Sequence, residues 1–203
     1  QRNRIQRYAE PILIHLYSEV LQKFRLAAQG KGISRKPPAH LKQRLETYFD
    51  PLPFYYEPLE AQQADRAKYP LNAVTQRPMA MYHSWDSQNA WLRQIHAHNH
   101  LFVNPRVARA AGIDDGGWMW VESHWGKVRC LCSYSEAVEP GTVWTWNAIG
   151  KTPGAWRLSP DANESQRGFL LNHVISEELP DAEGPISNSD PVTGQAAWYD
   201  VRV

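Results

Sequence analysis

Two groups of residues carry side chains that could bind a metal. His96, His98 and His100 form an H-x-H-x-H run, and alternate residues of an extended strand would place their imidazoles on one face. No acidic residue or cysteine lies nearby in the sequence to complete a zinc site. A polar loop, or a loop that faces another subunit, is therefore the favoured interpretation.

The second group is a C-x-C pair. Cys130 and Cys132 are the only two cysteines, and they lie in an apparent strand where residues two apart point the same way and cannot form an ordinary disulfide. Iron–sulfur and structural zinc sites normally need four thiolate or imidazole ligands. We therefore expect both thiols to be buried and inert, and we expect neither a metal site nor a catalytic residue in this chain.

A third group could bind a ligand without a metal. Hydroxyl, amide, imidazole and guanidinium groups are concentrated in two short stretches: Thr75, Gln76 and Arg77, then His83, Ser84, Gln88 and Asn89. Such donors and acceptors can recognise the edge of a flat, polar molecule, and two tryptophans flank the second stretch. The alternative is an ordinary turn whose side chains cap its own backbone.

The elements that must position these residues are mostly strands. Short strands are predicted at Leu71–Thr75, Leu101–Val103, Trp118–Ser123, Lys127–Tyr134 and Thr142–Trp146. A helix is predicted at Asn104–Ala111, a turn at Gly112–Gly117 and a tight turn at His124–Gly126. The alternation of Trp198, Val201 and Val203 indicates a returning strand. This order favours a small closed barrel with short helices.

The first 70 residues have a different character. Apolar spacing predicts an amphipathic helix over Ile5–Ala28 and a short helix over Leu41–Phe49. Four prolines between Asp50 and Pro70 favour an extended covering segment with little structure of its own. We expect residues 1–70 to be a helical and proline-rich connecting segment that belongs to the preceding part of a larger subunit. Residues 71–203 are expected to form the compact β-rich domain.

Composition limits the possible partners. The 203 residues include 22 basic and 21 acidic side chains, so the charge gives no reason to expect nucleic acid. No run of about 18 apolar residues is present, and the first residues do not form a secretory segment. The chain begins at Gln1 rather than at a methionine. We therefore expect a fragment, and any membrane attachment must come through a partner.

Five short motifs follow one another along the chain: Thr75–Arg77, His83–Ser84, Asn104–Pro105, Gly112–Gly116 and Pro140–Val143. No single motif is specific. Their order and spacing nevertheless closely resemble the dinucleotide-binding domain that ends the large subunits of molybdopterin oxidoreductases of the dimethyl-sulfoxide-reductase family. This resemblance implies a double-psi β-barrel over Leu71–Val203. It also implies one of two pterin guanine dinucleotides that together hold molybdenum or tungsten.

The resemblance also implies which residues contact the cofactor. A pyrophosphate and a polar pterin need fixed donors, which the two polar stretches supply. Asn172 matches a late asparagine of the family, whereas a lysine of the last strand is replaced by Ala196, Ala197 and Trp198, so Gln195 is the substitute candidate. The expected contacts are Thr75, Gln76, Arg77, His83, Ser84, Gln88, Asn89, Asn172 and Gln195.

Within the family, the stretches YHSWDSQNAWLRQIHAHNHLFVNP and NSDPVTGQAAWYDV resemble the sulfur-compound branch, particularly membrane-associated sulfite dehydrogenases related to polysulfide and thiosulfate reductases. The parent enzyme would then oxidise sulfite to sulfate. Its electrons would pass through iron–sulfur clusters to a ferredoxin-like subunit, then to the membrane anchor subunit, then to quinone.

The same resemblance implies a place in the bacterial cytoplasm, peripheral to the inner membrane. The metal's protein ligand and the cluster cysteines would lie in the rest of the subunit, so this chain alone should not catalyse the reaction. Four alternatives remain open: a polysulfide or thiosulfate reductase, a formate dehydrogenase-type subunit, a stand-alone cofactor-binding subunit without catalysis, and a barrel that has lost its cofactor.

Overall fold

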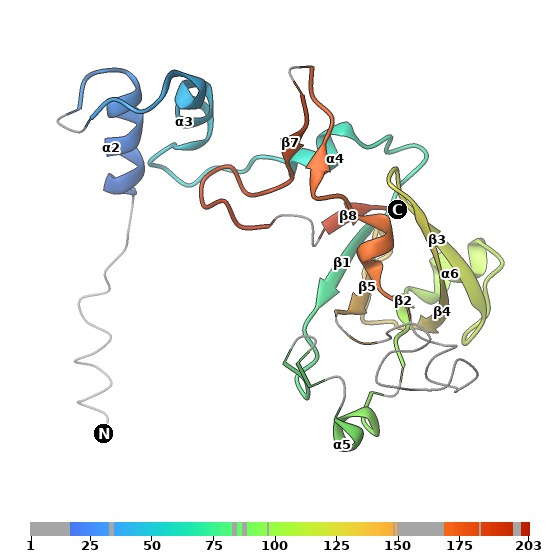
Figure 1. The fold of residues 1–203 in the computed structure, drawn as a ribbon. Helices are drawn as coiled ribbons and strands as arrows, with labels where there is room; N and C mark the ends of the chain where they lie inside the picture. Colours follow the sequence, from blue (N-terminus) through green and yellow to red (C-terminus); the bar gives the residue numbers. More distant parts are fainter. Residues whose placement is uncertain are drawn as a thin grey trace, which may run out of the picture. The chain divides into compact units, whose positions relative to one another are not determined.

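The computed structural model describes residues 17–32, 35–82, 85–86, 89–96, 98–147, 149, 169–182, 184–196 and 200–203. The chain forms two compact units. The first contains Gln1–Tyr56 with Pro191–Gly194, and the second contains Glu57–Asp190 with Gln195–Val203. Figure 1 shows the helices of the first unit in blue and the strands of the second from green to red.

The first unit is built around two helices. Helix α2 (Glu19–Ala28) begins after Ser18, whose hydroxyl accepts a hydrogen bond from the Leu21 N–H. A short 3-10 turn, η1 (Ala39–Leu41), leads into α3 (Lys42–Tyr48). The second predicted helix is confirmed, and the first is confirmed over Glu19–Ala28; Tyr17 and Ser18 are not helical, and residues 5–16 lie outside the described residues. Arg25 joins the two helices through Asp50 at 2.7 Å and the Glu46 carbonyl at 2.9 Å.

One prediction for the N-terminal segment is wrong. The stretch between Asp50 and Pro70 is not wholly extended, because α4 (Leu59–Gln63) forms within it. Pro58 immediately precedes this helix, where a missing N–H costs no intrahelical hydrogen bond. The prolines therefore bound a short helix and do not interrupt it.

The second unit contains a six-stranded mixed sheet. Its strands are β1 (Asn72–Gln76), β2 (Leu101–Val103), β3 (Trp118–Glu122), β4 (Lys127–Tyr134), β5 (Thr142–Trp146) and β8 (Asp200–Arg202). They lie in the order β3-β4-β2-β5-β1-β8, with the pairs β1–β5 and β2–β4 parallel and the remaining pairs antiparallel. Figure 1 shows the sheet curling into a half-barrel. The predicted β-rich fold with short helices is confirmed, but the predicted barrel is not closed within the described residues, because β3 and β8 do not pair with each other.

The individual strand predictions are close. Strands β2, β4 and β5 have the predicted bounds, β1 is shifted by one residue, and β3 ends one residue early. The predicted helix is α6 (Pro105–Ala110), capped by Asn104, whose Oδ1 accepts from the Arg106 N–H at 3.0 Å. The returning strand is β8, although Trp198 lies outside the described residues. A small ribbon, β6 (Glu178–Leu179) with β7 (Ile186–Ser187), was not predicted.

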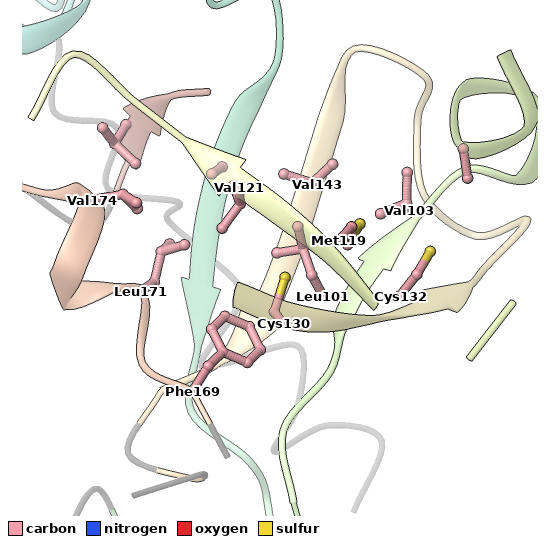
Figure 2. Close-up of a cluster of buried hydrophobic side chains, with 13 residues drawn as sticks. Leu101, Val103, Met119, Val121, Cys130, Cys132, Val143, Phe169, Leu171 and Val174 are labelled. Carbon is pink, nitrogen blue, oxygen red and sulfur yellow. The ribbon is translucent and has the colours of Figure 1, made fainter. Parts of the chain in front are cut away.

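The core lies inside the curl of the sheet. Figure 2 shows side chains from β2, β3, β4 and β5 pointing toward one another, with Phe169, Leu171 and Val174 completing the cluster. The last two belong to η3 (Leu171–Val174), which packs against the β3–β4 hairpin. There the Ser123 hydroxyl donates to the Val174 carbonyl at 2.5 Å. At Gly126, a side chain would meet the His173 carbonyl at 2.6 Å, so this close approach requires glycine.

The cysteine prediction is confirmed. Cys130 and Cys132 are both free and fully buried on β4. Burial is the main cause that raises the pKa of the Cys130 thiol to about 12 and that of Cys132 to about 11. Because the thiolate is the reactive form, both side chains behave as small apolar core residues.

Candidate functional site at the carboxyl ends of β1 and β5

The candidate site lies where two parallel strands end together. Thr75 is paired with Thr145 and Gln76 with Trp146 in the β1–β5 register. The Asn147 N–H extends this ladder by donating to the Gln76 carbonyl at 2.8 Å. The T-Q-R motif and the end of the later P-G strand, about seventy residues apart in sequence, therefore meet at one edge.

A buried asparagine fixes this edge. Asn99 is 0% exposed, and its Nδ2 donates to the Trp146 carbonyl at 2.8 Å and to the Phe169 carbonyl at 3.4 Å. Its Oδ1 accepts from the His100 N–H at 3.1 Å. The start of β2, the end of β5 and the segment leading into η3 are thus held by one side chain, which makes the edge rigid.

Two polar atoms at the edge have no hydrogen-bond partner among the residues that the structure describes. They are the Thr75 Oγ1 and the Asn147 Oδ1, which are both buried. Leaving a buried donor or acceptor unsatisfied costs about 1–3 kcal/mol, so such atoms need an explanation in a native structure. Because both lie at the ends of the paired strands, a polar ligand held there would satisfy them. These groups therefore fit the polar edges of a dinucleotide.

The charged group of the T-Q-R motif is accessible. Gln76 and Arg77 are exposed at the end of β1, and the Arg77 guanidinium carbon lies 5.7 Å from the centre of the Tyr82 ring. A guanidinium can form two parallel hydrogen bonds to a phosphate, a geometry that an ammonium group cannot match. Arg77 is therefore suited to a pyrophosphate.

The remaining predicted contacts are placed less favourably or are not described. Asn89 caps α5 (Ala90–Arg93), and its Oδ1 accepts from the Trp91 N–H at 3.0 Å, which matches the capped-turn alternative. Asn172 is exposed on η3, and Gln195 is exposed beside the isolated bridge between Ser189 and Ala196. His83, Ser84 and Gln88 lie outside the described residues. Their roles stay predictions.

Sequence reasoning missed Asn99, Thr145 and Asn147. Thr145 is buried, and its hydroxyl donates to the His100 carbonyl at 2.8 Å. An asparagine between two histidines, or a threonine between two tryptophans, is ordinary in a loop or a strand. The only available signal was the position of Thr145 and Asn147 around the carboxyl end of a strand that pairs with the T-Q-R strand.

The histidine run belongs to an aromatic face beside this edge. The rings of Phe102 and Trp144 stack with their centres 4.1 Å apart. The Trp146 ring lies edge-on to Trp144, with the ring centres 4.7 Å apart, and the centre of the His96 ring is 5.5 Å from that of Trp146. Burial lowers the pKa of His96, so its neutral form is favoured. Across the described parts of the chain, no three His, Cys, Asp or Glu side chains are grouped as metal ligands. The same parts contain no helix with the length and apolar character to cross a membrane.

These features define a β-rich domain with a polar ligand site at the edge of two parallel strands. Residues 71–187 match the family described as "Molydopterin dinucleotide binding domain". The chain therefore belongs to the molybdopterin dinucleotide-binding domain family.

Individual relatives agree with this membership. The chain is 73% identical over 199 residues to a sulfite dehydrogenase subunit of Allochromatium vinosum, covering 97% of this chain and 21% of that protein. It is 25% identical over 163 residues to the molybdopterin-containing subunit of thiosulfate reductase from Salmonella typhimurium, covering 80% of this chain and 18% of that protein. The chain thus spans about a fifth of the length of these relatives.

The fold has a counterpart of known structure. Acetylene hydratase from Pelobacter acetylenicus matches with a TM-score of 0.53 and 23% sequence identity, over 85% of this chain and 24% of that chain. At this identity the match shows a shared fold and carries no argument about the reaction. It supports the β-rich architecture implied by the sequence motifs.

Proposed function

We propose that this chain is the dinucleotide-binding part of a molybdenum oxidoreductase that oxidises sulfite to sulfate. The observation that carries the proposal is the 73% identity, over 97% of the chain, to a subunit of sulfite dehydrogenase. The thiosulfate reductase relative is only 25% identical, which favours sulfite oxidation over thiosulfate or polysulfide reduction. The balanced half-reaction converts sulfite and water to sulfate, two protons and two electrons.

When bound, the cofactor supplies the oxygen transfer and electron chemistry, and the protein binds and orients it. In our proposal, the Thr75 hydroxyl and the Asn147 amide bond to polar edges of a molybdopterin guanine dinucleotide, because both have buried oxygens without a partner. Arg77 pairs with the pyrophosphate. Asn99 is a positioning residue, since its three hydrogen bonds hold the edge on which these groups stand.

Other contacts are proposed from the motif resemblance alone. Gln76, Gln195 and Asn172 are exposed and accessible to a ligand, whereas Asn89 would have to contribute through its Nδ2, because its Oδ1 already caps α5. We further propose that His83, Ser84 and Gln88 contribute. The metal is molybdenum in this proposal, with tungsten as the alternative.

The same proposal extends to the assembly. The relative with 73% identity is named as one subunit, which supports an enzyme of several subunits. We propose that the rest of the catalytic subunit carries an iron–sulfur cluster. Electrons then pass to a ferredoxin-like subunit, which delivers them to the membrane anchor subunit that reduces quinone. The complex would lie at the cytoplasmic face of a bacterial inner membrane.

The experiment is an electron-transfer assay on the intact protein. Cells grown with molybdate should yield protein that reduces ferricyanide when sulfite is added, and cells grown with tungstate alone should yield protein that does not. Sulfate should form in proportion to the electrons transferred. Activity with thiosulfate or polysulfide but not with sulfite would contradict sulfite as the substrate and leave the family membership unchanged. Sulfite oxidation by protein that contains neither molybdenum nor tungsten would contradict the proposed cofactor dependence.

A further inference from the structure

Strand β3 forms one edge of the six-stranded sheet. Within the described ranges it pairs only with β4, in an antiparallel register that joins Met119 to Cys130 and Val121 to Val128. Two hydrogen bonds show which residues of β3 have backbone groups that face β4. The Cys132 N–H donates to the Gly117 carbonyl at 2.9 Å, and the Ser123 N–H donates to the Gly126 carbonyl at 2.8 Å. The odd-numbered residues of β3 therefore bond to β4. The backbone N–H and C=O groups of Trp118, Trp120 and Glu122 point away from the sheet.

The side chains at this edge are aromatic and basic. Trp118 is 43% exposed and Trp120 is 63% exposed, although both are large apolar residues. The Arg129 guanidinium carbon lies 3.8 Å from the centre of a Trp118 ring, and the Lys127 Nζ lies 5.3 Å from that of Trp120. Two cations of β4 thus lean across onto the tryptophans of β3, which orders all four side chains.

An exposed edge strand of this kind is unusual in a folded protein. Edges are commonly protected by charges, prolines or bulges, because unpaired backbone groups recruit other strands. Here the only charge on the outer face of β3 is Glu122, at the far end of the strand, and it is paired with Lys68 at 3.5 Å. The rest of the edge shows tryptophan and arginine, the residues most enriched in the energetic centres of protein interfaces.

We propose that the β3 edge, defined as Trp118, Trp120, Glu122, Lys127 and Arg129, binds an acidic, extended segment of a separate partner polypeptide as an added strand. The outward backbone groups favour a polypeptide over a nucleic acid, since only a polypeptide supplies matching N–H and C=O groups. The face carries two positive charges, Lys127 and Arg129, and one negative charge, Glu122, which is already paired with Lys68. A segment with acidic side chains at alternate positions would therefore complement the face.

The test measures binding of a defined probe to the intact protein. The probe is a capped peptide of alternating glutamate and valine, about nine residues long, and the control replaces glutamate with lysine. The acidic peptide should bind at least about tenfold more tightly than the basic peptide. Amide hydrogen exchange should slow at Trp118, Trp120 and Glu122 when the acidic peptide is present, because these amides become donors to the added strand.

Four variants separate the contributions. Arg129→Ala and Trp120→Ala should each weaken acidic-peptide binding by about tenfold or more. Trp120→Pro should weaken it further than Trp120→Ala, because proline removes the outward N–H and leaves the bonds to β4 intact. Trp91→Ala removes a tryptophan that is even more exposed, 78% on α5, and should leave binding unchanged.

Several results would overturn the proposal. One is equal binding of the acidic and basic peptides, and another is equal loss in Trp120→Pro and Trp120→Ala. Protection of the three amides in the free intact protein would show that its own chain, or a second copy, already covers the edge. Tighter binding of a single-stranded oligothymidylate than of the acidic peptide would assign the face to nucleic acid.

Discussion

At the scale of single residues, Thr75 and Thr145 lie opposite each other on β1 and β5 in very different surroundings. The Thr145 hydroxyl donates to the His100 carbonyl, so it stabilises the contact between β5 and the residue that precedes β2. The Thr75 hydroxyl oxygen is buried, and none of the described residues hydrogen-bonds to it. This contrast separates a residue that stabilises the domain from one that we assign to the ligand.

The first prediction uses this pair. Thr75→Val should leave the stability of the apoprotein unchanged or slightly higher, because it removes a hydroxyl that makes no hydrogen bond, and it should lower cofactor content. Thr145→Val should destabilise the domain by about 1–3 kcal/mol, because it leaves the His100 carbonyl unsatisfied. Urea unfolding of the apoprotein and pterin analysis of the purified protein measure the two effects. Equal destabilisation by both variants would contradict the assignment.

A second residue-scale feature is the buried carboxyl of Glu60 on α4, which is 2% exposed. Its Oε2 accepts a hydrogen bond from the Arg202 N–H of β8 at 3.3 Å. Burial raises the pKa of Glu60, and this effect exceeds the opposing influence of the Arg202 backbone and charge, Trp125 and His124. The folded state therefore favours the protonated carboxyl.

We predict that Glu60→Gln stabilises the α4–β8 contact at neutral pH and not at acidic pH. Below 4.5, the ordinary pKa, the carboxyl is protonated in both folded and unfolded states, so it carries no penalty. As the pH rises through the folded-state pKa, the buried group must ionise and stability is lost. The difference in unfolding free energy between variant and wild type should therefore grow from about pH 4 to about pH 7. A difference independent of pH would contradict this account.

At the scale of elements, alternation and turn residues were sufficient to predict the sheet. The exposed and buried pattern of β3, and the proline and glycine signals around β5, gave bounds within one residue. Short helices were missed, because α4, α5 and η3 have five residues or fewer and no complete amphipathic repeat. The contacts of Asn99 also could not be predicted, since they join segments up to 70 residues apart.

Asn99 gives the third prediction. Asn99→Ala should destabilise the strand edge by about 2–4 kcal/mol, because it leaves the Trp146 and Phe169 carbonyls without their donor in a buried place. Amide hydrogen exchange should accelerate in β2 and β5. The exposed Asn172 provides the control: Asn172→Ala should not alter exchange in these strands, and any loss of cofactor in that variant would support its proposed contact. Unchanged amide exchange in Asn99→Ala would contradict the proposed role of Asn99 in holding the strand edge.

At the scale of the whole molecule, the chain spans about a fifth of the length of the sulfite dehydrogenase and thiosulfate reductase relatives. The segment between β1 and β2 carries several large exposed apolar side chains: Met79, Tyr82, Trp85, Trp91 and Ile95. Large exposed apolar side chains that gather into one patch are characteristic of an interface. In our proposal this segment lies beside the cofactor site.

The most direct test of the central claim is the molybdopterin dinucleotide content of the intact protein and of its Arg77→Ala variant, measured per polypeptide. Arg109→Ala is the matched control, because Arg109 also lies over a tyrosine ring, at 5.3 Å from that of Tyr134, and is assigned no ligand contact. Loss of a charge-assisted contact to the pyrophosphate should weaken cofactor binding roughly ten- to hundredfold. We predict full cofactor content in wild type and Arg109→Ala and a clear loss in Arg77→Ala. Full content in Arg77→Ala, or no dinucleotide in the wild-type protein, would contradict the account.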